Sequence, residues 1–170
     1  DANFLYNLRV ANCTGDGITI NIVADSIFNN YESSFNSTDG WDIDSTKKVQ
    51  FFNCSAYGNT NGFSYLGDTG SIDTFTACIS EGNNTDGYAI NGAGGRWIAN
   101  RAYGNDGNGF HIAAGSGSVF IGNQSTNNDT DGFQIDNGVT FDIFIGNVST
   151  GNTTADWDND AQDGGNTFIG

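Results

Sequence analysis

Basic residues are scarce in this sequence, which has five Lys and Arg against 20 Asp and Glu and a formal net charge of −15. Such a polyanion repels nucleic acid and anionic lipid, so we exclude both as partners. Apolar runs are short as well, and none approaches the roughly 20 residues of a membrane-spanning helix. The acidity itself fits solubility, a salty environment or cation binding.

Cysteine is also rare, with only Cys13, Cys54 and Cys78 present. An odd number excludes complete pairing within the chain, and three are too few for a scaffold built on disulfides. The chain begins at Asp1 with neither a starting Met nor a signal peptide. We therefore expect either a mature form or a piece of a longer protein.

Helical periodicity is not evident, and the signatures of leucine-rich and ankyrin arrays are missing. The sequence has instead a repeated pattern, Asp or Asn, then Gly, then two apolar residues separated by one other. Its glycines are spaced by 23, 22, 25, 22 and 23 residues. The six copies begin at Asp16, Asp39, Asn61, Asp86, Asn108 and Asp131.

A second register has nearly the same period and predicts an internal ladder of stacked amides. Two residues before each ladder position we expect an inward apolar residue, as at Phe28, Phe51, Ile98 and Ile121. The predicted ladder is Asn7, Asn30, Asn53, Cys78, Asn100, Asn123 and Asn147. Cys54 lies one residue beyond a ladder position, so it and Cys78 should face opposite sides, and we expect free thiols.

These repeats predict an all-β fold, a right-handed parallel β-helix solenoid of about seven coils of roughly 23 residues. Stacked coils pair backbone groups and bury apolar faces that a single coil cannot bury. Residues 1–170 form one such domain in this interpretation. Because strand residues stand at 4–6 and 168–170, we expect further coils or other copies of the chain to cover the ends.

Outward positions of the strand after each Asp/Asn-Gly pair are where function is expected. The densest acidic group there is Asp39, Asp42 and Asp44, with Asp16 one coil earlier. Close carboxylates repel unless a cation intervenes, and calcium takes six to eight oxygen ligands. The alternative is that Asp39 shapes a turn and the other three are solvated.

The single histidine, His111, is a candidate general base. It lies about three coils from Asp42, or roughly 14 Å at the coil spacing, which is too far for one reaction centre. We therefore interpret it as a surface histidine without a catalytic role.

The segments 37–43, 49–59 and 61–63 resemble the pectate lyases of polysaccharide lyase family nine. That family has the parallel β-helix fold, a calcium site in an Asp-Asp-Gly-Trp-Asp-type segment and a lysine base in a following segment. Segment 36–53 also resembles polygalacturonases, although their following Gly-Asp-Asp is missing here.

The resemblance implies roles for a few positions. Asp39 and Asp42 match two calcium ligands, Thr38 stands where a third carboxylate is expected, and Asp16 could supply a ligand from the coil before. Ser64 occupies the position of the lysine base. A serine hydroxyl does not replace an amine as a base without an activating group.

Three functions remain open at this stage. The favoured one is a non-catalytic β-helix module of an extracellular or virion-surface protein, structural or polysaccharide-binding. The alternative is a calcium-dependent polysaccharide lyase or glycoside hydrolase acting on an acidic polysaccharide. A third hypothesis is an adhesive or spike segment within a larger fibre, because fold alone decides none of these.

Overall fold

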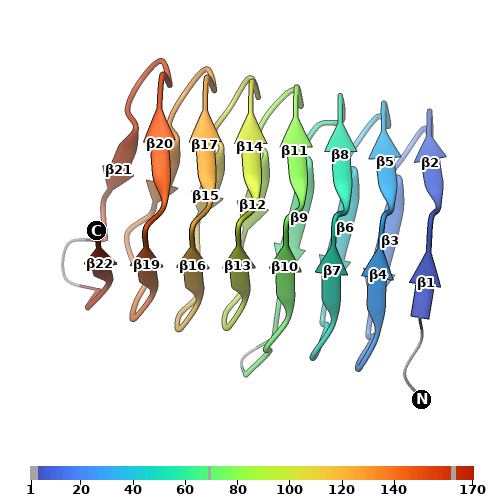
Figure 1. Ribbon diagram of the computed structural model, residues 1–170, viewed down its shortest axis with the longest axis horizontal. Helices are drawn as coiled ribbons and strands as arrows, with labels where there is room; N and C mark the ends of the chain where they lie inside the picture. Colours follow the sequence, from blue (N-terminus) through green and yellow to red (C-terminus); the bar gives the residue numbers. More distant parts are fainter. Residues whose placement is uncertain (1–3, 69, 162–163) are drawn as a thin grey trace.

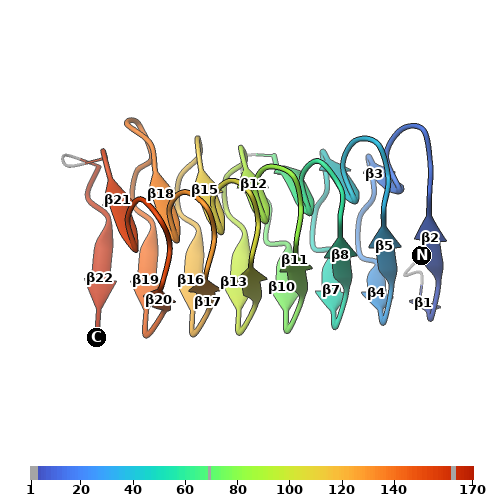
Figure 2. The same ribbon diagram turned by 90° about the horizontal axis from the view of Figure 1, so that it is seen from above.

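The computed structural model describes residues 4–68, 70–161 and 164–170 and is an all-β solenoid. The chain winds as a right-handed parallel β-helix, and successive coils lie side by side along the long axis (Figures 1 and 2). The predicted fold class, about seven coils of roughly 23 residues, is confirmed. Among the described residues, no helix is long and apolar enough to cross a membrane.

Each full coil contributes one strand to each of three parallel sheets, which we call sheets A, B and C. Sheet A contains β1 (Phe4–Tyr6), β4 (Ile27–Asn29), β7 (Gln50–Phe52), β10 (Thr74–Thr76), β13 (Arg96–Ile98), β16 (Val119–Ile121), β19 (Ile143–Ile145) and β22 (Thr167–Ile169). Sheet B contains β2 (Arg9–Ala11), β5 (Glu32–Ser34), β8 (Ser55–Tyr57), β11 (Ile79–Glu81), β14 (Arg101–Tyr103), β17 (Gln124–Thr126) and β20 (Val148–Thr150). Sheet C contains β3 (Ile18–Asn21), β6 (Trp41–Asp44), β9 (Phe63–Leu66), β12 (Tyr88–Ile90), β15 (Phe110–Ile112), β18 (Phe133–Ile135) and β21 (Trp157–Asn159).

The core consists largely of aromatic rings stacked coil upon coil. Phe28 stacks on Phe51 with ring centroids 5.3 Å apart, and Phe110 stacks on Phe133 at 4.7 Å, as the repeat predicted. Side chains alternate between the two faces of a strand, and a parallel register places equivalent residues one above another. Stacks of identical positions therefore fill the interior along its whole length.

The predicted ladder is wrong in register for its first three members. Asn7, Asn30 and Asn53 are exposed residues with φ of 51 to 60°, at the bend between sheets A and B. The internal ladder runs one residue later, where the backbone N–H of Cys78 donates to Oδ1 of Asn100 at 2.9 Å. Asn100, Asn123 and Asn147 continue it through their Oδ1 atoms.

The same one-residue shift changes the faces of the neighbouring positions. Phe75, Trp97 and Phe120 fill the inward row of sheet A, whereas Ile98 and Ile121, which were expected inside, lie on its outer side. Asn suits both an amide ladder and a left-handed bend, because its short side chain tolerates positive φ. The spacing of Asn residues in the sequence does not distinguish a ladder position from a bend position.

Cys54 and Cys78 consequently occupy equivalent positions in adjacent coils, so the argument that they face opposite sides is wrong. Both are fully buried free thiols, and each Sγ lies 3.5–3.7 Å from backbone carbonyls of its own and the preceding coil. They take the place that Asn100 and Asn123 take in later coils, where the amide nitrogen donates to the same carbonyl row.

A second buried ladder, which the sequence did not reveal, joins sheet B to sheet C. Each amide donates to Oδ1 of the next amide at 2.8–3.2 Å, and Oδ1 also accepts the backbone N–H of the preceding ladder residue. Its members are Asn36, Asn59, Asn83, Asn105, Asn128 and Asn152. One of these amides stands in the turn that leads into each strand of sheet C from β6 to β21.

Candidate functional site

The outer face of sheet C carries an unbroken row of side chains running along the solenoid axis. The register places the middle residue of each strand beside its equivalent in the next coil. In order, the row is Thr19, Asp42, Ser64, Ala89, His111, Gln134 and Asp158. The predicted outward positions are therefore confirmed, and β21 extends them by one coil.

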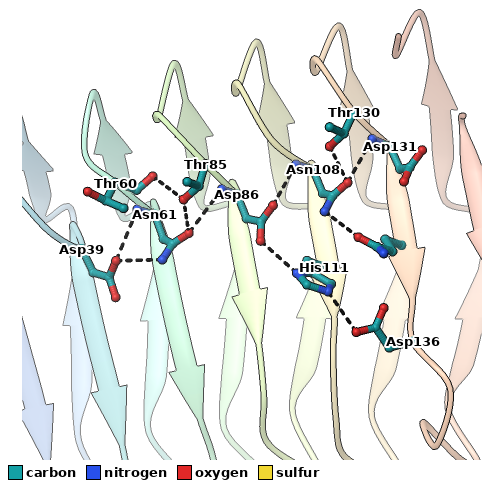
Figure 3. Close-up of polar contacts among 11 residues, drawn as sticks. Asp39, Thr60, Asn61, Thr85, Asp86, Asn108, His111, Thr130, Asp131 and Asp136 are labelled. Carbon is teal, nitrogen blue, oxygen red and sulfur yellow. Dashed lines mark hydrogen bonds and ion pairs between the residues drawn. The ribbon is translucent and has the colours of Figure 1, made fainter. Parts of the chain in front are cut away.

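A surface ladder borders this row where the chain enters sheet C. It is built from the Asp or Asn before each repeat glycine. In the first five copies the side-chain oxygen accepts the backbone N–H of the equivalent residue in the next coil (Figure 3). Asn61, for example, donates its Nδ2 to Asp39 Oδ1 at 2.9 Å. These hydrogen bonds hold the polar side chains at a regular spacing.

Threonine hydroxyls reinforce the ladder from the preceding position. Thr130 donates to Asn108 Oδ1 at 2.5 Å, and Thr85 and Thr38 donate to Asn61 and Asp16 respectively. Because these side chains are already held in place, they lose less conformational entropy when a ligand binds. A preorganised binding face has this property.

The acidic group predicted as a metal site lies at the N-terminal end of this face. Asp42 and Asp44 point outward from β6, while Asp16 and Asp39 belong to the surface ladder. The pKa of Asp42 is raised, first by burial and then by the negative charges of Asp16, Asp39 and Asp44. The carboxylate of Asp42 is thus close enough to the other three to be repelled by their charges.

Their present contacts do not form a coordination site. Oδ1 of Asp16, Asp39 and Asp44 each accepts hydrogen bonds from within the protein. Among the described residues, no three Asp, Glu, His or Cys side chains converge as metal ligands. Calcium binding by Asp16, Asp39, Asp42 and Asp44 stays a prediction.

His111, which we interpreted as a surface histidine without a catalytic role, lies between two carboxylates. Its Nδ1 lies 3.0 Å from Asp86 Oδ2, and its Nε2 lies 3.2 Å from Asp136 Oδ2 (Figure 3). Asp86 and Asp136 belong to the coils before and after it, so three coils meet at one imidazole. The sequence hid this group because its members are 25 residues apart in the chain.

The two carboxylates favour the doubly protonated ring. The pKa of His111 is raised, chiefly by the hydrogen bond to Asp86, with a smaller contribution from Asp136 against an opposing effect of burial. The imidazolium donates from both nitrogens to acceptors, whereas a neutral ring has only one N–H. Asp86 itself is positioned by the surface ladder, since its Oδ1 accepts the N–H of Asn108 at 2.8 Å.

We expect the single histidine resonance in an NMR pH titration to have a pKa above 6.5. Asp86→Asn should lower that pKa more than Asp136→Asn, because the bond to Asp86 is the larger cause of the shift. The interaction of protonated His111 with Asp86 and Asp136 stabilises the fold fully below the unfolded-state pKa of 6.5. This stabilisation is lost as pH rises through the folded-state pKa of His111. For a partly exposed group its size is about 1 kcal/mol or less.

His111→Gln provides the control for the stability measurement. Burial raises the pKa of Asp142 to about 6. Because the folded state disfavours its ionised form, the stability of the fold also decreases as pH rises from about 4 to 6. Subtracting the pH profile of the variant from that of the wild type removes this second effect. An unperturbed or lowered histidine pKa would contradict the bridged geometry.

Ser64, at the position of the lyase lysine, lies in the outward row between Asp42 and Ala89. The strands of sheet C and the turn residues before them contain no Lys or Arg. His111 is the one basic side chain in that described row. The face can therefore donate and accept hydrogen bonds over its whole length but carries little positive charge.

No protein-family model and no curated protein sequence matches this chain. Its structure resembles the A-module of mannuronan C-5 epimerase AlgE4 from Azotobacter vinelandii, with a TM-score of 0.75 and 16% identity over 97% of this chain and 54% of that one. Pectate lyase Pel9A has a TM-score of 0.62 and 18% identity over 84% of this chain and 43% of that one. The periplasmic alginate epimerase AlgG has a TM-score of 0.64 and 13% identity over 98% of this chain and 45% of that one.

This chain thus spans about half the length of the solved structures that it resembles. At such identities the likeness shows the fold alone. The predicted resemblance to a pectate lyase β-helix is confirmed at that level.

Proposed function

We propose that this chain is a non-catalytic module that binds a polysaccharide along the outer face of sheet C, within an extracellular or virion- or cell-surface protein. The observation that carries the proposal is the polar row of sheet C, bordered by its hydrogen-bonded surface ladder (Figure 3). A straight row of donors and acceptors suits an extended chain of hydroxyl-bearing sugar units. The named substrates of the structural neighbours, mannuronan, pectate and alginate, are polysaccharides.

Charge limits which polysaccharide this face accepts. Asp42, Asp44, Asp86 and Asp136 lie on or beside the row, and only His111 opposes them. An anionic polymer is repelled unless a cation bridges the two surfaces. Calcium at the Asp16, Asp39, Asp42 and Asp44 group is our proposal for that cation. A neutral polysaccharide needs no bridge.

Isothermal titration calorimetry with alginate, polygalacturonate and a neutral glucan, each with calcium or with EDTA, tests this proposal. We expect the uronate polymers to bind sheet C only with calcium, and Asp42→Asn to weaken that binding. Ala89→Tyr places a ring in the middle of the outward row, between Ser64 and His111. We expect it to reduce affinity by about tenfold or more, or roughly 1.4 kcal/mol of binding free energy.

Gln124→Tyr is the matched control, because Gln124 is an exposed outward residue of sheet B. It adds the same ring to a different face and should leave the affinity unchanged. Equal losses in the two variants, or full affinity in Ala89→Tyr, would show that sheet C is not the binding face. Failure of all three polymers to bind in every condition would refute the binding function.

The second candidate function is a polysaccharide lyase or epimerase, and the Asp86–His111–Asp136 group favours it. Carboxylates that orient and charge an imidazole are a common way to prepare a general acid or base. Two features oppose it: both ring nitrogens of His111 are occupied, and sheet C has no Lys or Arg to balance a substrate carboxylate. Unsaturated or epimerised uronate products that vanish in His111→Gln would establish this second function instead.

A further inference from the structure

A groove of about 450 Å³ lies on the outer face of sheet A, on a different sheet from the row of sheet C. Four outward residues in register across four coils form its floor, on strands that lie side by side in Figure 1. These are Ile27, Gln50, Thr74 and Arg96. Lys48 and Ile72 form one wall, and both are exposed. Its volume is in the range of small-molecule sites.

Two successive connections between sheets C and A supply that wall, Lys48 from the first and Ile72 from the second. Five residues, 45–49, join β6 to β7, but seven, 67–73, join β9 to β10. The buried carboxylate of Asp73 ties the two connections together. It accepts hydrogen bonds from the Thr46 hydroxyl at 2.6 Å and the Val49 backbone N–H at 2.7 Å.

Asp73 has two further hydrogen-bond partners, Ser71 from the longer connection and Tyr65 from β9, the strand before it. Ser71 donates to the same carboxylate, and the Tyr65 hydroxyl lies 3.1 Å from it. Asp73, Ser71 and Tyr65 are all at most 1% exposed. Thr46 and Val49 near Lys48, and Ser71 and Asp73 on either side of Ile72, are therefore held by one buried network, so the wall is preformed.

The charge of the groove is opposite to that of the whole protein. Lys48 and Arg96 face it, and among the described residues neither is in an ion pair. Asp25 is the one acidic residue in its lining, which leaves a net positive charge in a protein of net charge −15. Backbone positions two coils apart are separated by about 10 Å, so Lys48 and Arg96 suit an elongated anion.

We propose that the sheet A groove binds the carboxylate groups of a uronate oligosaccharide without calcium. The guanidinium of Arg96 matches a carboxylate in two-pronged geometry, and Lys48 supplies a second positive charge. Gln50 and Thr74 supply hydrogen bonds to hydroxyl groups, and Ile27 and Ile72 give apolar surface for a sugar ring. The choice of sugar rests on the proposed polysaccharide function, whereas the site is independent of sheet C.

The test is calorimetric titration of a galacturonate hexamer into the protein at low ionic strength with EDTA present, so that calcium cannot assist sheet C. We expect binding that weakens with added salt. Lys48→Gln and Arg96→Gln should each lower affinity by about fivefold, the effect of an exposed ion pair, and the double variant by more. Asp25→Asn should raise affinity, because it removes the repelling charge.

Lys47→Gln is the matched control, because Lys47 is the exposed neighbour of Lys48 and lines a different hollow. It removes the same charge from the protein and should leave affinity unchanged. No binding by the wild type, equal losses in Lys47→Gln and Lys48→Gln, or tighter binding of a sulfated hexamer would overturn the inference. Ala89→Tyr and the addition of calcium affect binding at sheet C alone, whereas Lys48→Gln and Arg96→Gln affect binding at the sheet A groove alone. Failure of the sheet C proposal and failure of the groove proposal are therefore distinguishable.

Discussion

Gly62→Ala should destabilise the protein by about 3 kcal/mol or more, as expected when a well-packed interior must accept an extra group. A Cβ atom at this position would lie 1.8 Å from Ser80 Oγ and 2.6 Å from the Gly87 carbonyl oxygen. That space holds a buried hydrogen-bond network, because Ser80 Oγ donates to the Gly87 oxygen at 2.8 Å and accepts from Asn83. The substitution therefore both crowds adjacent coils and breaks buried polar contacts. Urea unfolding followed by circular dichroism measures the loss.

Gly15→Ala is the control for this substitution. Nothing lies within 4 Å of a Cβ atom built at Gly15, and its φ is not in the left-handed region. We expect a change of about 0.5 kcal/mol or less, as for most surface substitutions. If the two glycines tolerated alanine equally well, the close stacking of the repeat glycines against the serine row would be wrong.

Asn105→Ala should cost about 3–5 kcal/mol, because each buried polar group left without a partner costs about 1–3 kcal/mol. Oδ1 of Asn105 accepts the Asn83 backbone N–H at 3.1 Å and the Asn83 Nδ2 at 2.9 Å. Asn105 also donates its Nδ2 to Asn128 Oδ1 at 2.9 Å. The same Nδ2 donates to the Ser80 carbonyl oxygen at 3.4 Å, so removing the amide leaves two donors and two acceptors incompletely bonded in a region closed to water. Thermal and urea unfolding both report the effect.

The matched comparison is Asn84, the exposed residue that follows the ladder residue Asn83 in the chain. Asn84→Ala removes the same side chain but keeps the backbone N–H that donates to the Asn59 carbonyl at 2.8 Å. Its effect should be about 0.5 kcal/mol or less, as for an exposed polar group. An equally small loss for Asn105→Ala would mean that the amide ladder contributes little to the stability of the solenoid.

Most of the candidate face could be predicted from the sequence, but its interactions could not. Alternation after each repeat glycine placed Asp42, Ser64, His111 and Gln134 on one outward row, and the register confirms it. The bridging of His111 by Asp86 and Asp136 escaped prediction. These residues belong to three coils, and the two acids lie in different columns, one before its strand and one after.

The groove on sheet A illustrates the same limit. The 25-residue step between Gly62 and Gly87 is visible in the sequence as an irregular repeat. Only the folded chain shows that the extra residues are anchored through Asp73 to the coil before, where they flank Lys48 and face Arg96.

The sequence by itself determined the period, the parallel β-helix and the inward rows of sheet C, because these follow from local alternation and from glycine at a fixed place in each coil. The tertiary structure alone decided which Asn residues are buried and which form bends. It also placed Cys54 beside Cys78 and brought charged side chains of successive coils together. Asn serves a left-handed bend and an amide ladder equally well, so the choice between them depends on contacts with residues about 23 positions away. Those contacts exist only when one coil lies on the next.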